Sequence, residues 1–263
     1  MSAPARRLRR VAALASCAAV VLLMAGCSQF DGPQNTFSPA GEVAQEQKFL
    51  FLFVTWIALP IMVLVLGAIV YAAIRFRRRS DDEPLPKQVH GNTALELTWT
   101  IIPVILLVII AVPTLDGIAK LGAKKGDSAF NVTITGTRFT WEFDYNDVMD
   151  ADGQPLFTTD ELHVPVCAVV AADVEAKDVL HSFWIPRLAG KQDAVPGRTN
   201  HLWFQADKPG TYEGQCAEFC GIGHSNMRMR VVVQTAEDFR TWATEQGGTV
   251  SATLVGEPQG DGE

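Results

Sequence analysis

The sequence predicts an all-β sandwich or barrel that follows a two-helix transmembrane hairpin. Three observations lead to this fold class. Long charge-free apolar runs occupy the first half of the chain, and an arginine cluster separates two of them. Short alternating apolar runs, divided by Gly, Pro and Asp, fill the second half. A length of 263 residues leaves room for one or two domains.

The first apolar run, residues 11–25, follows four arginines among residues 6–10. A basic segment before about fifteen apolar residues is typical of a secretory signal and is too short for a comfortable membrane span. The run ends in Leu-Met-Ala-Gly-Cys27, which resembles the lipobox of bacterial lipoproteins. We therefore expect residues 1–26 to be removed and Cys27 to be lipidated. The alternative is an ordinary signal peptide with a chance cysteine.

The next two apolar runs have the length of membrane helices. Residues 49–74 carry no charge and are followed at once by an arginine cluster, which places that end in the cytoplasm. Residues 97–118 are uncharged apart from Asp116 and return the chain to the exterior. We expect an exterior segment over 27–46 and a hairpin over 47–120. The alternative, buried helices of a soluble protein, fits poorly with charge-free runs of this length beside the arginines.

The rest of the chain has the pattern of short strands. Apolar and polar residues alternate over 130–135 and again over 139–145, which is the period of a half-buried strand. Further apolar runs lie between clusters of Gly, Pro and Asp, at residues 162–166, 167–170, 202–205 and 229–233. These runs predict a sandwich or barrel over 126–235. Residues 236–263 form a tail, with a short helix expected over 239–245.

The exterior part of the chain is acidic. Residues 126–235 hold 15 Asp and Glu against 8 Lys and Arg. This balance argues against nucleic acid as a partner. It suits a basic protein partner through electrostatic steering, although on charge alone the simpler explanation, acidity that keeps the domain soluble, is favoured.

Two cysteines, a histidine and a methionine lie within twelve residues, in the stretch Cys216-Ala-Glu-Phe-Cys220-Gly-Ile-Gly-His224-Ser-Asn-Met227. Because the exterior is oxidising, a disulfide between the cysteines is one interpretation. A metal site is the other, because the two glycines permit a tight loop that turns the four side chains toward one point. Thiolate, imidazole and thioether together favour copper over the hard cations.

A second imidazole comes from upstream, at His181. A single blue-copper site needs one Cys, two His and a weak Met, so two cysteines are one too many for it. Two bridging thiolates suit a pair of copper ions. Zinc remains the competing metal because two Cys and two His are also a zinc ligand set, although the methionine and the exterior location count against it.

Four stretches together resemble subunit II of the haem–copper cytochrome c oxidases: "HGNTALELTWTIIPVILLVIIAVP", "DVLHSFWIP", "KQDAVPGRTNHLWF" and "GTYEGQCAEFCGIGHSNM". The resemblance covers residues 47–233. It implies a cupredoxin-like Greek-key domain after the hairpin and a binuclear copper centre, CuA, bridged by Cys216 and Cys220. It also implies the remaining ligands, which are His181 and Met227 on one copper and His224 and the backbone carbonyl of Glu218 on the other.

The resemblance further implies a function and partners. Such a chain accepts electrons from cytochrome c and passes them to the haem of subunit I, which reduces O2 to water with proton pumping. The implied partners are subunit I, subunit III, a cytochrome c and the lipid membrane, in a bacterial plasma membrane with the copper domain outside. The sequence has no Cys-x-x-Cys-His motif, so we expect the cytochrome c to be a separate protein.

Several residues acquire expected roles by the same resemblance. The Glu218 side chain would bind a magnesium ion shared with subunit I, and Glu96 would stand at the mouth of a proton pathway. The carboxylates of Asp178 and Asp193 match positions implicated in docking the electron donor. Electron uptake at the surface is expected near two aromatic residues, Phe139, which stands where the family has tryptophan, and Trp141, which we expect on the same strand face.

Three other classes of protein stay open at this point. Subunit II of a quinol oxidase has the same fold but lacks the cysteines and the ligand histidine. A CuA domain of a nitrous or nitric oxide reductase is a second class, and a copper chaperone or storage lipoprotein without a redox role is a third. The remaining histidines, His90, His163 and His201, are expected to be structural, and Cys167 to be a small buried residue.

Overall fold

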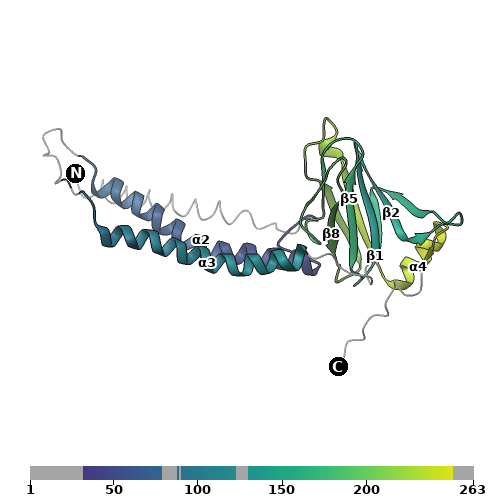
Figure 1. The fold of residues 1–263 in the computed structure, drawn as a ribbon, viewed down its shortest axis with the longest axis horizontal. Helices are drawn as coiled ribbons and strands as arrows, with labels where there is room; N and C mark the ends of the chain where they lie inside the picture. Colours follow the sequence, from purple (N-terminus) through teal and green to yellow (C-terminus); the bar gives the residue numbers. More distant parts are fainter. Residues whose placement is uncertain (1–31, 79–87, 89, 123–129, 251–263) are drawn as a thin grey trace, which may run out of the picture.

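The computed structural model describes residues 32–78, 88, 90–122 and 130–250. The predicted signal peptide, the predicted lipidation site Cys27 and the end of the predicted tail lie outside these residues. Two long helices, α2 (Glu42–Arg75) and α3 (Thr93–Gly122), run side by side away from a β domain (Figure 1). Both are long and apolar enough to cross a membrane. They extend beyond the predicted 49–74 and 97–118 because polar residues at their ends continue the helices past the apolar runs.

The β domain consists of two sheets, as the alternating pattern predicts. One sheet has the strand order β11-β2-β1-β5-β8, with β3 paired to β2, and the other has the order β4-β10-β9-β6-β7. The strands are β1 (Phe130–Thr137), β2 (Thr140–Met149), β3 (Pro155–Thr159), β4 (Glu161–Pro165), β5 (Val170–Ala176), β6 (His181–Trp184), β7 (Gln192–Ala194), β8 (Asn200–Phe204), β9 (Gly210–Cys216), β10 (Arg228–Gln234) and β11 (Thr249–Val250).

The core lies between the two sheets and is rich in aromatic rings. Trp141, Phe143 and Tyr145 occupy every second position of β2, and all three side chains are fully buried. Phe183 of β6, on the opposite sheet, contacts the Trp141 ring edge-on, with 5.4 Å between ring centroids. The alternation seen in the sequence therefore marks the inward face of β2, as predicted.

The predicted C-terminal tail begins with a helix that belongs to the β domain. This helix, α4 (Ala236–Glu245), lies on the far side of the domain from the hairpin (Figure 1). Phe239 is fully buried, and its ring meets the Phe130 ring edge-on, with 5.5 Å between the ring centroids. The helix starts earlier than residue 239 because the Thr235 side chain caps it, accepting a hydrogen bond from the Asp238 amide.

The hairpin is attached to the β domain at both of its exterior ends. Before α2, the Ala40 amide donates to the Arg187 carbonyl over 2.8 Å, and the Ala40 carbonyl accepts from the Asp207 amide over 2.9 Å. At the end of α3, the indole N–H of Trp203 donates to the Leu121 carbonyl over 3.0 Å. These bonds set how the β domain sits on the helices.

One predicted strand and one predicted burial were wrong. The chain turns at residues 166–167, and the strand that follows starts at Val170. Cys167 is exposed rather than buried, with a φ of 60°. The apolar run misled the prediction because its residues 167–169 lie in the connection between β4 and β5 and not in a strand.

Candidate metal centre

Two paired strands and one loop carry the six predicted ligand residues. His181 is the first residue of β6 and Cys216 is the last residue of β9. These strands are antiparallel neighbours, with Phe183 opposite Cys216. The loop over residues 217–227 carries the other four residues and returns to β10. A hydrogen bond of 2.9 Å from the Cys216 amide to the Met227 carbonyl closes this loop at its base.

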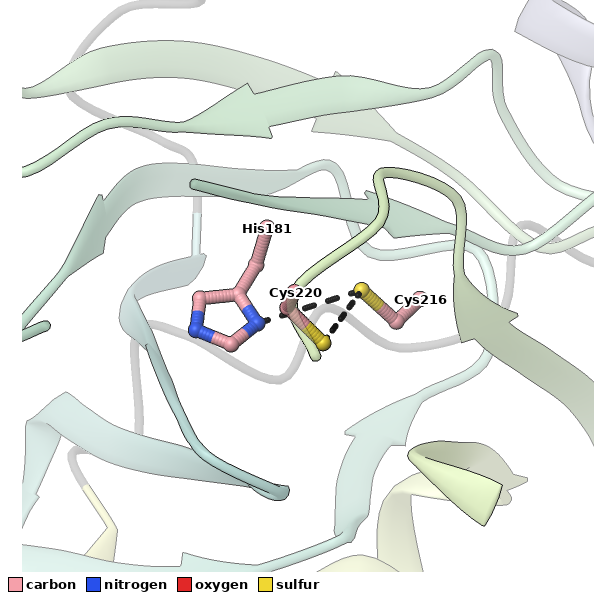
Figure 2. A group of neighbouring side chains, drawn as sticks. All are labelled: His181, Cys216 and Cys220. Atoms are coloured by element: carbon pink, nitrogen blue, oxygen red, sulfur yellow. Dashed lines mark hydrogen bonds between the residues drawn. The ribbon is translucent and has the colours of Figure 1, made fainter. Parts of the chain in front are cut away.

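The centre of the site is formed by an imidazole and two sulfurs that point toward one another (Figure 2). Nδ1 of His181 lies 3.9 Å from Sγ of Cys216, which lies 4.0 Å from Sγ of Cys220. All three residues are buried, and their ligand atoms lie within 4.8 Å of one another. A disulfide requires about 2.05 Å between sulfurs, and both cysteines are free thiols. The disulfide interpretation therefore does not describe this structure.

The remaining predicted ligands surround the same two sulfurs. Sγ of Cys220 lies 3.7 Å from Nδ1 of His224 and 3.7 Å from Sδ of Met227. Sγ of Cys216 lies 3.2 Å from the backbone carbonyl oxygen of Glu218. The structure thus brings together every donor atom that the sequence analysis named for the copper site.

The Cys220 thiol is held in its neutral form when no metal is bound. Burial, together with the neighbouring Cys216, raises the pKa of the Cys220 thiol to about 11. A coordinated metal cation reverses this balance, because it stabilises the thiolate directly. The pocket is therefore poorly suited to bare thiolates but well suited to thiolates that share positive metal charge.

Asp178 holds the outer edge of the His181 ring. Its Oδ1 lies 2.9 Å from His181 Nε2, and its Oδ2 accepts from the backbone N–H of Arg138 over 3.0 Å and from Arg138 Nε over 2.9 Å. Partial burial favours the neutral acid, but these hydrogen bonds outweigh it and lower the pKa of Asp178 below its usual range. The carboxylate is therefore ionised and engaged within the chain. Sequence reasoning assigned Asp178 to donor docking and did not identify Arg138 at all.

Asp193, the second expected docking residue, is also bonded within the chain. Its Oδ1 accepts hydrogen bonds of 2.8 Å from the Ser182 hydroxyl and of 2.8 Å from Lys191 Nζ. These bonds lower the pKa of Asp193, the Lys191 bond most of all. Ser182 follows the candidate ligand His181 and is fully buried, so this carboxylate too lies next to the metal site.

The two aromatic residues expected near electron uptake lie in different places. Trp141 is fully buried, with its ring edge-on to His181 at 6.0 Å between centroids. Phe139 lies in the turn before β2 and is 37% exposed, so the expectation that the two share a strand face was wrong. A methyl group added at Gly223 would lie 2.5 Å from Phe139 ring atoms. The Phe139 ring therefore rests directly on the metal-binding loop.

Glu96 takes part in the start of α3, at the opposite end of that helix from the β domain. Its Oε1 accepts a hydrogen bond of 3.2 Å from the Asn92 amide, and the Asn92 side chain accepts one of 3.2 Å from the Leu95 amide. This reciprocal arrangement satisfies amides that the helix itself leaves unpaired. The proton-pathway role of Glu96 stays a prediction.

The tip of the metal-binding loop exposes large apolar side chains that the sequence analysis did not single out. Phe219 is 76% exposed and Ile222 is 98% exposed. The signal was present in the sequence, because Ile222 stands between two glycines and cannot be buried by its immediate neighbours. Large apolar side chains at a loop tip are typical of a contact surface.

Comparison with known families gives two matches that together span both parts of the chain. A family model described as "Cytochrome C oxidase subunit II, transmembrane domain" matches residues 33–116. A second, "Cytochrome C oxidase subunit II, periplasmic domain", matches residues 142–236. The first covers the hairpin and the second covers most of the β domain, including all the candidate ligands.

Individual relatives agree with these matches. Cytochrome c oxidase subunit 2 of Alkalihalophilus pseudofirmus is 40% identical over 85% of this chain and 65% of its own length. A probable cytochrome c oxidase subunit 2 of Rickettsia bellii is 33% identical over 79% of this chain and 82% of its own length. The periplasmic domain of subunit II of the cytochrome oxidase of Bradyrhizobium japonicum is 34% identical, with 46% of this chain and 95% of that chain covered and a TM-score of 0.40.

The chain is shorter than some of these relatives, spanning about two thirds of the A. pseudofirmus protein. Its hairpin and β domain correspond to the two family models in the same order, and a relative matched over most of its own length has the same description. The chain therefore belongs to the cytochrome c oxidase subunit II family.

Proposed function

We propose that this chain is the electron-accepting subunit of a respiratory cytochrome c oxidase and holds two copper ions at the candidate metal centre. One observation carries the proposal. Four donor groups converge on the sulfurs of Cys216 and Cys220, two of them within 4 Å of each sulfur. Such an arrangement has little use in a purely structural loop, which would oxidise to a disulfide on the exterior side.

The donor set fits copper better than zinc. Two thiolates, two imidazoles, a thioether and a carbonyl are more than one tetrahedral zinc ion can use, and zinc sites do not recruit methionine. Soft sulfur donors together with imidazole suit copper in both of its oxidation states. Two copper ions that share two thiolates spread the charge of one transferred electron over both metals, so little else must rearrange.

The chain itself keeps this geometry fixed. His181 and Cys216 belong to adjacent strands of one sheet, and Met227 and Cys216 are joined by a backbone hydrogen bond. Met227 is fully buried and both cysteines are nearly so, which keeps water away from the sulfurs. A site built on paired strands changes shape little between redox states.

The assignments to each copper follow the family. His181 and Met227 complete one copper, and His224 with the Glu218 carbonyl completes the other. The half-buried Glu218 side chain is assigned, also by the family, to a magnesium ion shared with subunit I. Glu96 serves the proton pathway at the cytoplasmic end of the hairpin, and Cys27 is the lipidation site.

The partners follow from the same proposal. The hairpin packs in a bacterial plasma membrane against subunit I, with subunit III in the same complex, and the β domain faces the exterior. A separate cytochrome c supplies electrons to the acidic β domain, with Asp178 and Asp193 as docking carboxylates and Phe139 at the uptake surface. Trp141 lies in the core and is in ring contact with His181.

Rapid mixing of the copper-loaded full-length chain in detergent with reduced cytochrome c tests this function. We expect one haem to be oxidised for each copper centre that is reduced. The double variant Cys216→Ser/Cys220→Ser should leave cytochrome c reduced and serves as the control. The proposal fails if a small chemical reductant reduces the copper but cytochrome c does not.

A further inference from the structure

The two candidate ligand histidines have unlike surroundings, and the difference lies behind the His181 ring. His181 is fully buried, and its Nε2 lies 2.9 Å from the Asp178 carboxylate. A methyl group added at the buried Gly136 would lie 3.0 Å from the His181 ring. The ring is therefore confined on one face by the β1 backbone and at its outer nitrogen by a charged acceptor.

Asp178 is itself held from the opposite side. Arg138 contributes two donors to Oδ2, its backbone N–H at 3.0 Å and its Nε at 2.9 Å. The Val179 amide donates to Oδ1 over 2.7 Å. Both carboxylate oxygens are thus occupied, and the ion pair with Arg138 cancels the negative charge locally.

The hydrogen bond to Asp178 determines which nitrogen of His181 can bind a metal. Both Asp178 oxygens accept hydrogen bonds from backbone and side-chain N–H groups, so the carboxylate is the acceptor toward His181 as well and Nε2 carries the hydrogen atom. In the neutral ring the lone pair then resides on Nδ1, which is the atom that faces Cys216 Sγ at 3.9 Å. A carboxylate in this position also makes an imidazole a stronger electron donor to a bound metal.

His224 has no such support. Its ring is half-buried and meets the ring of Phe219 edge-on at 5.7 Å between centroids. Within residues 32–78, 88, 90–122 and 130–250, no hydrogen-bond partner for His224 Nε2 is found. The carboxylate behind the ring is therefore a feature of one histidine and not of the site as a whole.

We propose that Asp178 is a positioning residue that fixes the orientation and tautomer of His181 for copper, and that Arg138 locks Asp178 in place. This inference rests on the proposed copper site and deepens it. It gives Asp178 a task in addition to donor docking: its substitution changes the metal centre itself and not only the encounter with cytochrome c.

The test compares full-length chains in detergent, each loaded with copper. The variants are Asp178→Ala, Asp178→Asn and Arg138→Gln. The matched control is Asp173→Asn, because Asp173 also bonds a histidine, His201 at 2.6 Å, and lies on strand β5 of the other sheet. The readouts are the visible and EPR spectra, the reduction potential and the rate of copper loss to a chelator, none of which requires the assembled oxidase.

We expect Asp178→Ala to bind copper about ten-fold more weakly, as is usual when a carboxylate behind a ligand histidine is removed. Its reduction potential should rise, because a less basic ligand and a lost negative charge both disfavour Cu(II). Asp178→Asn keeps one acceptor oxygen and should lose less affinity but still raise the potential. Arg138→Gln should show a smaller change in the same direction, and Asp173→Asn should match the parent chain.

Unchanged spectra, potential and copper release in all three variants would overturn the inference and leave Asp178 with the docking role alone. If Asp178→Ala does not fold, the asparagine and Arg138→Gln variants decide the matter. A parent chain that binds no copper would instead overturn the proposed function, so the two failures can be told apart.

Discussion

The candidate metal centre has two halves that are built differently. His181 and Cys216 belong to the paired strands β6 and β9, and His181 is locked from behind by Asp178 and Arg138. Cys220 and His224 lie on the loop 217–227, whose tip exposes Ile222 almost completely. One half is part of the β core, and the other is a loop at the surface.

The difference suggests a division of labour within one site. The strand half fixes positions that must not change when an electron arrives. The loop half brings the remaining donors to the sulfurs while it presents apolar side chains, Phe219 and Ile222, to solvent. The loop that carries four of the six candidate ligand residues is thus also the one that presents exposed apolar side chains.

The largest difference in stability is expected between two variants in which His181 or His224 is replaced by alanine. His181→Ala empties a fully buried position and should destabilise the metal-free chain by about 2–4 kcal/mol. His224→Ala removes a half-buried ring and should cost less than about 1 kcal/mol. Thermal unfolding of both metal-free variants, followed by near-ultraviolet circular dichroism of the β domain, measures the difference. Equal losses would mean that the two halves are equally part of the core.

A smaller effect is expected where the loop meets the turn before β2. Gly223→Ala places a methyl group 2.5 Å from Phe139 ring atoms, which should displace the loop and cost about 1–3 kcal/mol. Copper loading should fall with it, because the loop carries Cys220 and His224. The added variant Phe139→Ala should restore most of the loss, as measured by unfolding and copper content of the double variant. No recovery would show that the Phe139 contact does not limit the loop position.

The smallest effect is expected away from the site, at Asp144 on strand β2. Burial, then the neighbouring Glu142, raises the pKa of Asp144, although Lys177 opposes the shift. Because the folded-state pKa lies above the unfolded value, the favourable contribution of the neutral acid is complete below about pH 4 and is lost as the pH rises through the folded-state pKa.

Asp144→Asn should therefore stabilise the chain at pH 7 by less than about 1 kcal/mol, since the carboxylate is partly exposed. The gain should vanish as the pH falls below about 4, while copper binding stays unchanged. Unfolding curves of the parent and the variant at several pH values check this. A gain that persists at low pH would point to packing and not to charge.

Much of this architecture follows from the sequence because its causes are local. Charge-free runs predict the hairpin, and the alternation of apolar and polar residues over 139–145 predicts the buried face of β2. The ligand loop is recognisable because its donors are close in sequence. The start of α2 was harder to predict. Ala40, just before this helix, is held by backbone hydrogen bonds to Arg187 and Asp207, which are far away in the sequence.

The support behind His181 could not be predicted for a similar reason. Arg138 and Asp178 are 40 residues apart in sequence, and they meet because β1 and β5 pair in parallel, with Gly136 opposite Ala176. Each residue alone resembles a surface charge. Cys167 was predicted to be buried but is exposed. The prediction failed because the apolar run that contains Cys167 includes a turn.

The most direct test of the central claim is the copper content of the full-length chain in detergent, measured together with its visible and EPR spectra. The account predicts two copper ions per chain and an EPR hyperfine pattern from one unpaired electron shared by both. One copper per chain with the spectrum of a mononuclear blue site, or a preference for zinc over copper, would contradict it.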